Sequence, residues 1–215
     1  MLFQVQKSDS TEPKTRLALL GTLGHLHTEP LRYDLACLRS LVETLEPDLL
    51  GVEVEPDAWE QGDLSAASVE VREGLVPAAQ RTDTVIVPLA GPSPMELAPP
   101  EDGGLARLRA RVLQGADRML TRFQRTADGP EGVNSPLFGH VCEFICYLEE
   151  AAAGDVGRQA WEAINQRILD RLLWAVRRDP GRRMLVAVQC RRVHWLEARL
   201  LPLQAEVVLV PYSEL

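Results

Sequence analysis

Short apolar runs, each about the length of one buried strand, alternate along this chain with segments that have the apolar spacing of helices. The runs occupy residues 17–20, 49–54, 84–89, 184–188 and 207–210. Parallel strands need a crossover between them, and a helix is the usual crossover, so this alternation favours a parallel sheet. The sequence therefore predicts an α/β fold, with a mostly parallel central sheet of about five strands flanked by helices.

The segments between these runs set the expected domain organisation. We expect a flexible N-terminal segment at 1–15 and a single α/β domain at 16–215. A helical insert at about 101–155 separates the third and fourth strands and follows a proline-rich linker at 91–104. Helices are predicted at 28–45 with Thr28 as the N-cap, and at 64–80, 105–125, 137–152, 157–178 and 194–201. Ligands of such sheets bind at the carboxyl ends of the strands, so a site is expected among the residues that follow each strand.

The composition is that of an ordinary soluble domain of 215 residues, 46% of them hydrophobic and 25% charged. No run reaches the roughly 18 apolar residues of a membrane helix, and the first residues lack the pattern of a signal peptide. The net charge of −8, with an acidic first half, argues against a nucleic-acid-binding surface. We therefore expect a cytoplasmic protein with a small-molecule or peptide ligand and with neither nucleic acid nor a membrane as partner. The sequence does not define the oligomeric state.

Glycines and histidines follow the first predicted strand, in the run Gly21-Thr22-Leu23-Gly24-His25-Leu26-His27. Glycine allows a sharp turn and a close approach of the backbone to a ligand. In an extended chain His25 and His27 point the same way, and histidine can ligate a metal or act as a general base near neutral pH. The alternative is that both rings bond only to nearby backbone.

Two carboxylates, Glu53 and Glu55, follow the second predicted strand and share one face of an extended chain. Glu53 interrupts an apolar run, and burying a carboxylate costs several kcal/mol unless it finds a partner. A histidine, an arginine or a metal ion would supply that partner. The alternative places Glu53 on an exposed edge strand or at a helix N-terminus.

The fourth predicted strand ends in Gln189-Cys190-Arg191-Arg192-Val193-His194. Arginines beside a helix N-terminus make an anion site plausible. Arg191 and Arg192 can equally be solvated, or pair with Glu53 and Glu55 to hold the strand ends together. Both interpretations stay open on the sequence.

Cys142 and Cys146, two of the four cysteines, lie four residues apart on one side of a predicted helix. Such a pair can bind a metal. The apolar stretch around them instead favours core packing of two small hydrophobic side chains.

These segments, in this order, resemble the TraB/PrgY and Tiki-type proteins, the ChaN-like haem-binding proteins and the erythromycin esterases. The run Leu19–His27 resembles the G-T-x-H opening of that superfamily, and Pro47–Glu53 resembles its P-D-x-V-x-V-E strand. Arg183–His194 is similar to its late L-V-x-V-G-x-x-H strand. The first motif histidine falls on His25 or His27, and the last motif position falls on Arg192 or His194.

The resemblance implies an α/β sheet sandwiched by helices, with the motif histidines and glutamate lining the active site. Tiki-type members are metal-dependent proteases, and the esterases use a histidine base without metal. Carried over to this chain, the implied catalytic residues are His25, His27, Glu53 and His194, and the implied substrate-binding residues are Glu55, Arg191 and Arg192. A divalent metal ion (manganese, cobalt or zinc) would be held by His27 and Glu53.

Two functional hypotheses follow. The first is a hydrolase of ester or peptide bonds that acts at the strand ends, with or without a metal ion. The second is a catalytically degenerate small-molecule-binding, anion-binding or regulatory protein on the same scaffold, motivated by the arginines in the late motif. The second hypothesis predicts that Glu53 forms an ion pair with Arg191 or Arg192 in the cleft.

Overall fold

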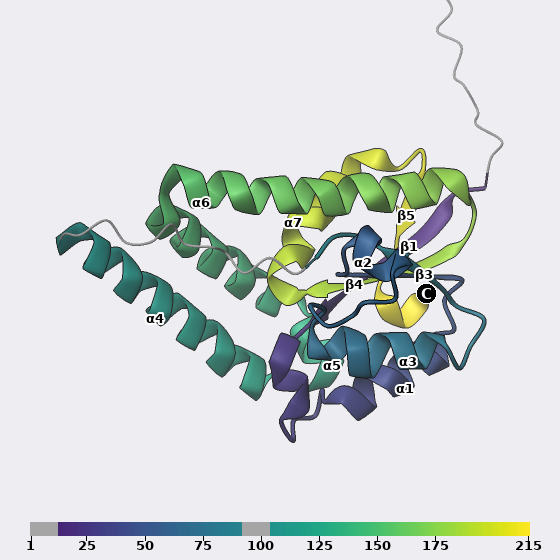
Figure 1. The fold of residues 1–215 in the computed structure, drawn as a ribbon, viewed down its shortest axis with the longest axis horizontal. Helices are drawn as coiled ribbons and strands as arrows, with labels where there is room; N and C mark the ends of the chain where they lie inside the picture. The colour runs from purple at the N-terminus through teal and green to yellow at the C-terminus, as the bar shows by residue number, and fades with distance from the viewer. Residues whose placement is uncertain (1–12, 92–103) are drawn as a thin grey trace, which may run out of the picture.

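A computed structural model describes residues 13–91 and 104–215, and its centre is a five-stranded sheet in which every paired strand is parallel (Figure 1). The strand order is β3-β2-β4-β1-β5. The strands are β1 (Thr15–Thr22), β2 (Leu49–Val52), β3 (Val85–Pro88), β4 (Arg183–Gln189) and β5 (Val207–Leu209). The predicted α/β fold is therefore confirmed.

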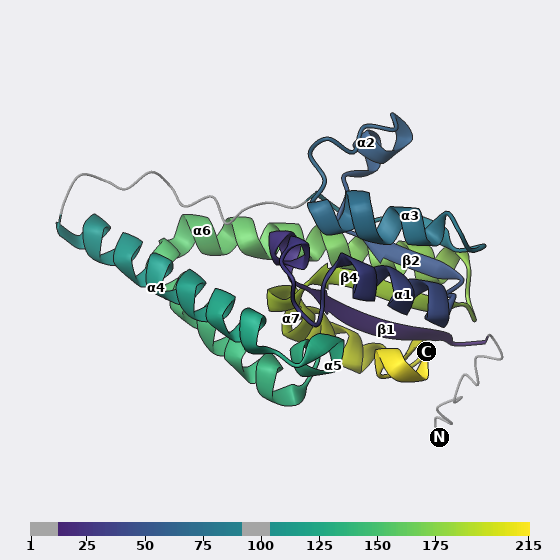
Figure 2. The same cartoon turned by 90° about the horizontal axis from the view of Figure 1, so that it is seen from below.

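Helices cover both faces of the sheet (Figures 1 and 2). One face packs against α1 (Leu35–Leu45), the π-helical turn η2 (Glu70–Leu75) and α3 (Val76–Ala79). The other face packs against the second half of α6 (Pro136–Arg178) and against α7 (Cys190–Leu200). Because the central strands are buried on both faces, their sequences are continuous apolar runs rather than alternating patterns.

Among the described residues, α4 (Gly104–Thr126), α5 (Gly129–Val133) and α6 lie between β3 and β4 in the chain, and the first half of α6 forms the insert together with α4 and α5. Figure 2 shows α4 and this half of α6 extending side by side beyond the sheet, and the two helices pack against each other. Gly154, with φ of 71°, interrupts α6, so the two helices predicted for this stretch are separated at one glycine. Neither these helices nor any other described helix is long and apolar enough to span a membrane.

Several predicted boundaries are wrong. Thr28 is not a helix N-cap, since it ends the 3₁₀ turn η1 (Gly24–Thr28), and Asp34 caps α1 by accepting a hydrogen bond from the Cys37 N–H at 2.8 Å. The helix predicted at 64–80 begins only at residue 70. The short helix α2 (Pro56–Glu60) was not predicted, and α7 starts four residues before the predicted position.

Thr15 already belongs to β1, although it falls in the N-terminal segment predicted to be flexible. Most of that segment, and the proline-rich linker between residues 92 and 103, lie outside the described residues. The C-terminal part adds the short turns η3 (Leu201–Leu203) and η4 (Tyr212–Glu214).

Gly21 allows the end of β1 to approach the start of α7 closely. A Cβ atom on Gly21 would lie 3.1 Å from both Cα and Cβ of Cys190 and 3.3 Å from Oδ1 of Asn134. The Gly21 N–H also donates a 2.6 Å hydrogen bond to that Asn134 oxygen. Residue 21 is thus confined on the side where α7 begins, and a larger side chain would push α7 away from the sheet.

We expect Gly21→Ala to lower the free energy of unfolding by about 1–3 kcal/mol, because the added methyl group overpacks this contact. Gly115→Ala is the matched control, since a Cβ there meets open space on the exposed side of α4. It should raise stability by roughly 0.5–1 kcal/mol through helix propensity. Urea unfolding of both variants makes the measurement, and a Gly21→Ala protein as stable as the wild type would contradict the close approach.

Candidate functional site

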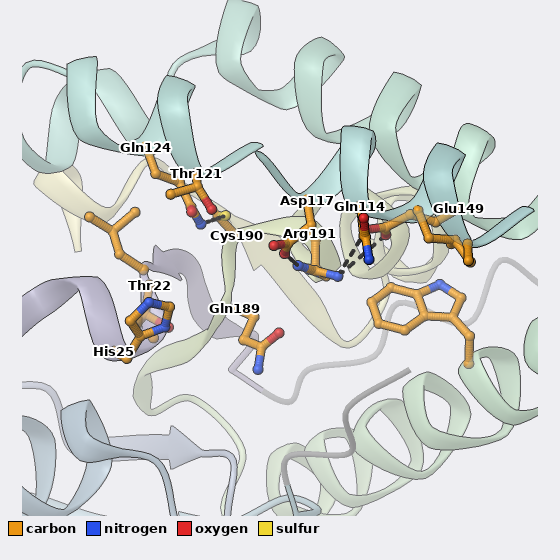
Figure 3. Close-up of a pocket in the computed structure, with 15 residues that line it drawn as sticks. Thr22, His25, Gln114, Asp117, Thr121, Gln124, Glu149, Gln189, Cys190 and Arg191 are labelled. Atoms are coloured by element: carbon orange, nitrogen blue, oxygen red, sulfur yellow. Dashed lines mark hydrogen bonds and ion pairs between the residues drawn. The ribbon is translucent and has the colours of Figure 1, made fainter. Parts of the chain in front are cut away.

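The candidate site lies at the carboxyl ends of the neighbouring strands β1 and β4, where the connections to the next helices leave the sheet toward opposite faces. The chain leaves β1 toward α1 on one face and leaves the neighbouring strand β4 toward α7 on the other face. Such a switch point leaves a crevice between the two strand ends. A cavity of about 540 Å³ opens here, within the usual size of a small-molecule site (Figure 3).

Threonine and glutamine side chains line the cavity from both the sheet and α4. Thr22 and Gln189, which are register partners at the ends of β1 and β4, line it on the sheet side. Gln114, Thr121 and Gln124 line it from α4 (Figure 3). The helical insert therefore closes the crevice with amide and hydroxyl groups.

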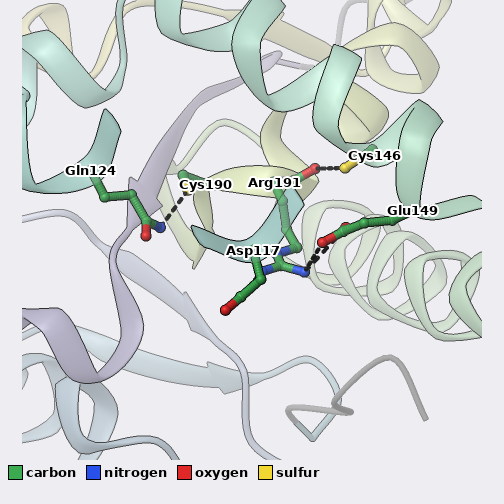
Figure 4. Close-up of polar contacts among 6 residues, drawn as sticks. All are labelled: Asp117, Gln124, Cys146, Glu149, Cys190 and Arg191. Carbon is green, nitrogen blue, oxygen red and sulfur yellow. Dashed lines mark hydrogen bonds and ion pairs between the residues drawn. The ribbon is translucent and has the colours of Figure 1, made fainter. Parts of the chain in front are cut away.

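Arg191 extends into the cavity from the first turn of α7 and is balanced there by two acidic residues (Figure 4). Its Nη1 lies 3.3 Å from both carboxylate oxygens of Glu149, and its Nη2 lies 3.9 Å from Asp117. Burial raises the pKa of Glu149, and the attraction of Arg191 opposes that shift. The cavity thus has no surplus positive charge for an anion.

Glu53 and Arg192 form a buried ion pair beneath this cavity. The Arg192 Nε lies 2.6 Å from Oε1 of Glu53, and the side chains are 0% and 3% exposed. Arg192 also donates to the Asn165 amide oxygen and lies 4.6 Å over the ring of Trp161, while the Gln189 N–H donates to Glu53 Oε2 at 3.4 Å. Burial raises the pKa of Glu53, and Arg192 acts in the opposite direction by favouring the carboxylate. The pairing of Glu53 with Arg192, one alternative from the sequence, is confirmed, but the expectation that it lies in the cleft is wrong, because neither residue lines the cavity.

We expect Arg192→Met to lower the free energy of unfolding by about 3–5 kcal/mol, because it leaves the Glu53 carboxylate buried without a counter-charge. Adding Glu53→Gln removes that charge and should restore part of the loss. Chemical denaturation at neutral pH measures both variants.

The matched control for this experiment is Arg167→Met. Arg167 lies 3.6 Å from Glu55, and both of these side chains are about half exposed, at 57% and 47%. Such a pair contributes roughly 0–1 kcal/mol. If Arg192→Met costs no more than this control, the buried pair does not stabilise the fold as argued.

His27 is buried and bonded through both ring nitrogens to backbone. Its Nε2 accepts a 2.9 Å hydrogen bond from the Leu23 N–H, and its Nδ1 lies 2.7 Å from the Tyr33 carbonyl oxygen, to which it donates. The ring also packs edge-to-face on Tyr33. Burial lowers the pKa of His27 to about 4. In this arrangement neither nitrogen is available to a metal ion or a substrate, which argues against the metal-binding and base roles implied for His27.

The neutral His27 ring makes stability depend on pH. Its pKa is about 4 in the folded protein and about 6.5 in the unfolded chain, so the unfolded chain binds the extra proton between those values. Stability should therefore fall by about 3 kcal/mol through this group as the pH drops from 6.5 toward 4. His27→Gln should flatten that part of the curve, whereas His140→Gln, at an exposed position, should leave it unchanged. Parallel curves for wild type and His27→Gln would contradict this role.

The other implied site residues are dispersed. His25 is exposed and lines the cavity beside Thr22, whereas Glu55 and His194 are not among its lining residues. Glu55 is half exposed beside Arg167, and His194 lies half-buried on α7, where burial lowers its pKa. Among the described residues, no three histidine, cysteine or acidic side chains are placed to hold a metal ion. The structure thus unites Glu53 with Arg192 and places His25 and Arg191 at the cavity.

Glu70 is a buried residue at this site that sequence reasoning missed. It begins the π-helical turn η2, is 1% exposed, and accepts a 3.5 Å hydrogen bond from the Thr22 hydroxyl. Burial raises its pKa. In the sequence Glu70 stands between Val69 and Val71. Like Glu53 it is an acidic residue among apolar neighbours, and this pattern could have identified it as buried.

Comparisons with known proteins, made against family models, curated sequences and solved structures, gave no match. The resemblance to the TraB/PrgY and Tiki-type superfamily therefore stays a prediction.

Proposed function

We propose that this protein binds a small uncharged polar molecule in the strand-end cavity, on a TraB/Tiki-like scaffold that does not carry out hydrolysis. The observation that carries the proposal is the pairing of Glu53, the residue matched to the family glutamate, with Arg192 at 2.6 Å. A carboxylate held in this way is not free to ligate a metal or to orient a histidine. The protein then corresponds to the binding alternative rather than to the hydrolase.

The class of ligand follows from the chemistry of the cavity. Amide and hydroxyl groups both donate and accept hydrogen bonds, as a sugar or a nucleoside requires. The charge of Arg191 is already balanced by Glu149 and Asp117, so an anion would gain little. Leu23 and Leu113 add apolar lining for the body of a ligand.

Filling the cavity should abolish binding without unfolding the protein. We expect Ala110→Trp to remove the ligand-observed NMR signals of uncharged sugars and nucleosides, because Ala110 lines the cavity from α4. Arg111→Trp is the matched control, since Arg111 is the next residue of the helix, is exposed, and does not line the cavity. Carboxylate and phosphate compounds in the same panel should give no signal. Binding that survives Ala110→Trp, or a preference for the anions, would refute the proposal.

A hydrolase remains the second candidate, because His25 is exposed at the cavity beside the Thr22 hydroxyl and is free to act as a base. Nitrophenyl esters and fluorogenic peptides, assayed with and without manganese, cobalt or zinc, distinguish the two functions. The binding proposal predicts no turnover above background. Turnover that His25→Ala abolishes would establish the hydrolase in its place.

A further inference from the structure

An exposed apolar strip runs along α4 on the side away from the cavity. Leu108, Val112 and Phe123 are between 37% and 58% exposed, and their spacing of four and eleven residues places them on one side of the helix. The residues of α4 that line the cavity, such as Asp117 and Thr121, lie on the opposite side of the helix axis. The three apolar side chains therefore remain exposed to water in the single chain.

The first half of α6 has a similar strip. Leu137, Phe144 and Tyr147 are between 55% and 76% exposed, and their spacing of seven and three residues places them on one side of that helix. The two helices contact each other side by side (Figure 2), and their buried residues, such as Leu120 and Ile145, belong to one apolar cluster. On each helix the strip borders this buried side at the edge away from the cavity. The two strips thus form one exposed apolar face of the insert, which is typical of a protein interaction site.

The two helices that carry this face have opposite charges. The sequence of α4 contains six arginines and one acidic residue, whereas residues 136–154 contain three glutamates and neither lysine nor arginine. Arg111 and Arg118 are exposed at the outer edge of the strip on α4, and Glu143 and Glu150 lie at the outer edge of the strip on α6. Each pair is seven residues apart, or about two helical turns. The basic edge and the acidic edge therefore match in spacing and are opposite in charge.

We propose that two copies of this chain associate through this face into a four-helix bundle, in which α4 of each copy packs against the first half of α6 of the other. A second copy fits the face because the chain itself carries both the basic and the acidic edge. Association through this face does not depend on what the cavity binds, since the cavity lies on the other side of α4.

The charges select one of the two ways in which a two-fold axis can pair the faces. An axis perpendicular to the helices would place the basic α4 against its own copy, which like charges oppose. An axis parallel to the helices places α4 against the acidic helix and makes neighbouring helices antiparallel, as in up-and-down bundles. Arg118 then faces Glu143 of the other copy. Arg111 faces Glu150 two turns further along, and the apolar strips of both copies leave water between these edges.

Sedimentation velocity of the wild-type protein over a concentration series tests the proposal, and variants locate the interface. We expect a reversible dimer with no larger species, because a two-fold interface is closed. Leu108→Glu should weaken the dimer by roughly tenfold or more, because it places a charge in the apolar face. Leu201→Glu is the matched control, since Leu201 is 52% exposed but lies on η3, outside this face. A wild type that stays monomeric would overturn the proposal and leave the face to another protein or a membrane surface, and a dimer that both variants affect equally would also overturn it.

Charge reversal tests how the two copies are arranged. Arg118→Glu and Glu143→Arg should each weaken the dimer, because each brings like charges together between α4 and α6 of different copies. The double variant should regain most of the wild-type affinity, since the pair forms again with its charges exchanged. Both positions are exposed, so circular dichroism should show the wild-type fold in all three proteins. A dimer that Arg118→Glu strengthens would place α4 against α4 and would reject the proposed bundle.

Discussion

The ion pair between Glu53 and Arg192 determines how the strand ends are arranged. Two opposite charges taken out of water must satisfy each other, since either one alone would be strongly destabilising. Glu53 follows β2 and Arg192 lies in the first turn of α7, so their contact fixes the start of α7 against the sheet. The neighbouring residues Cys190 and Arg191 take their positions in the cavity from that same turn. The site is therefore organised around a pair that is itself inaccessible to a ligand.

The topology explains why a cavity lies above this pair. Chain crossovers leave β1 and β4 toward opposite faces, so the helices that follow these two strands do not cover the ends between them. The insert formed by α4 and the first half of α6 covers these ends instead (Figure 2). Gly21 lets α7 begin close to β1, which narrows the crevice on that side. Sheet, insert and α7 each contribute one wall of the cavity.

The sequence predicts the sheet better than the site, for a physical reason. Buried parallel strands leave continuous apolar runs, and all five runs correspond to strands. A carboxylate in such a run needs a partner, so an arginine partner for Glu53 could be anticipated. The hydrogen bonds of the His27 ring could not be anticipated, because their partners are backbone groups of an irregular loop that has no periodicity. Gln124 and Glu149 give no signal either, since only the tertiary packing of the insert brings them to the strand ends.

The ion pairs that join the acidic first half of the chain to the second half differ in how far they are exposed to water. Within the described part of the chain, acidic residues of the first half meet arginines of the second in three pairs, Glu29–Arg125, Glu55–Arg167 and Glu53–Arg192. The first two are substantially exposed, and such pairs contribute little to stability. Only in the third pair are both side chains buried. Arg191, the adjacent residue, is balanced within the second half by Glu149. The charges at the strand ends thus pair with one another, and what the cavity offers a ligand is its amide and hydroxyl groups beside an apolar lining.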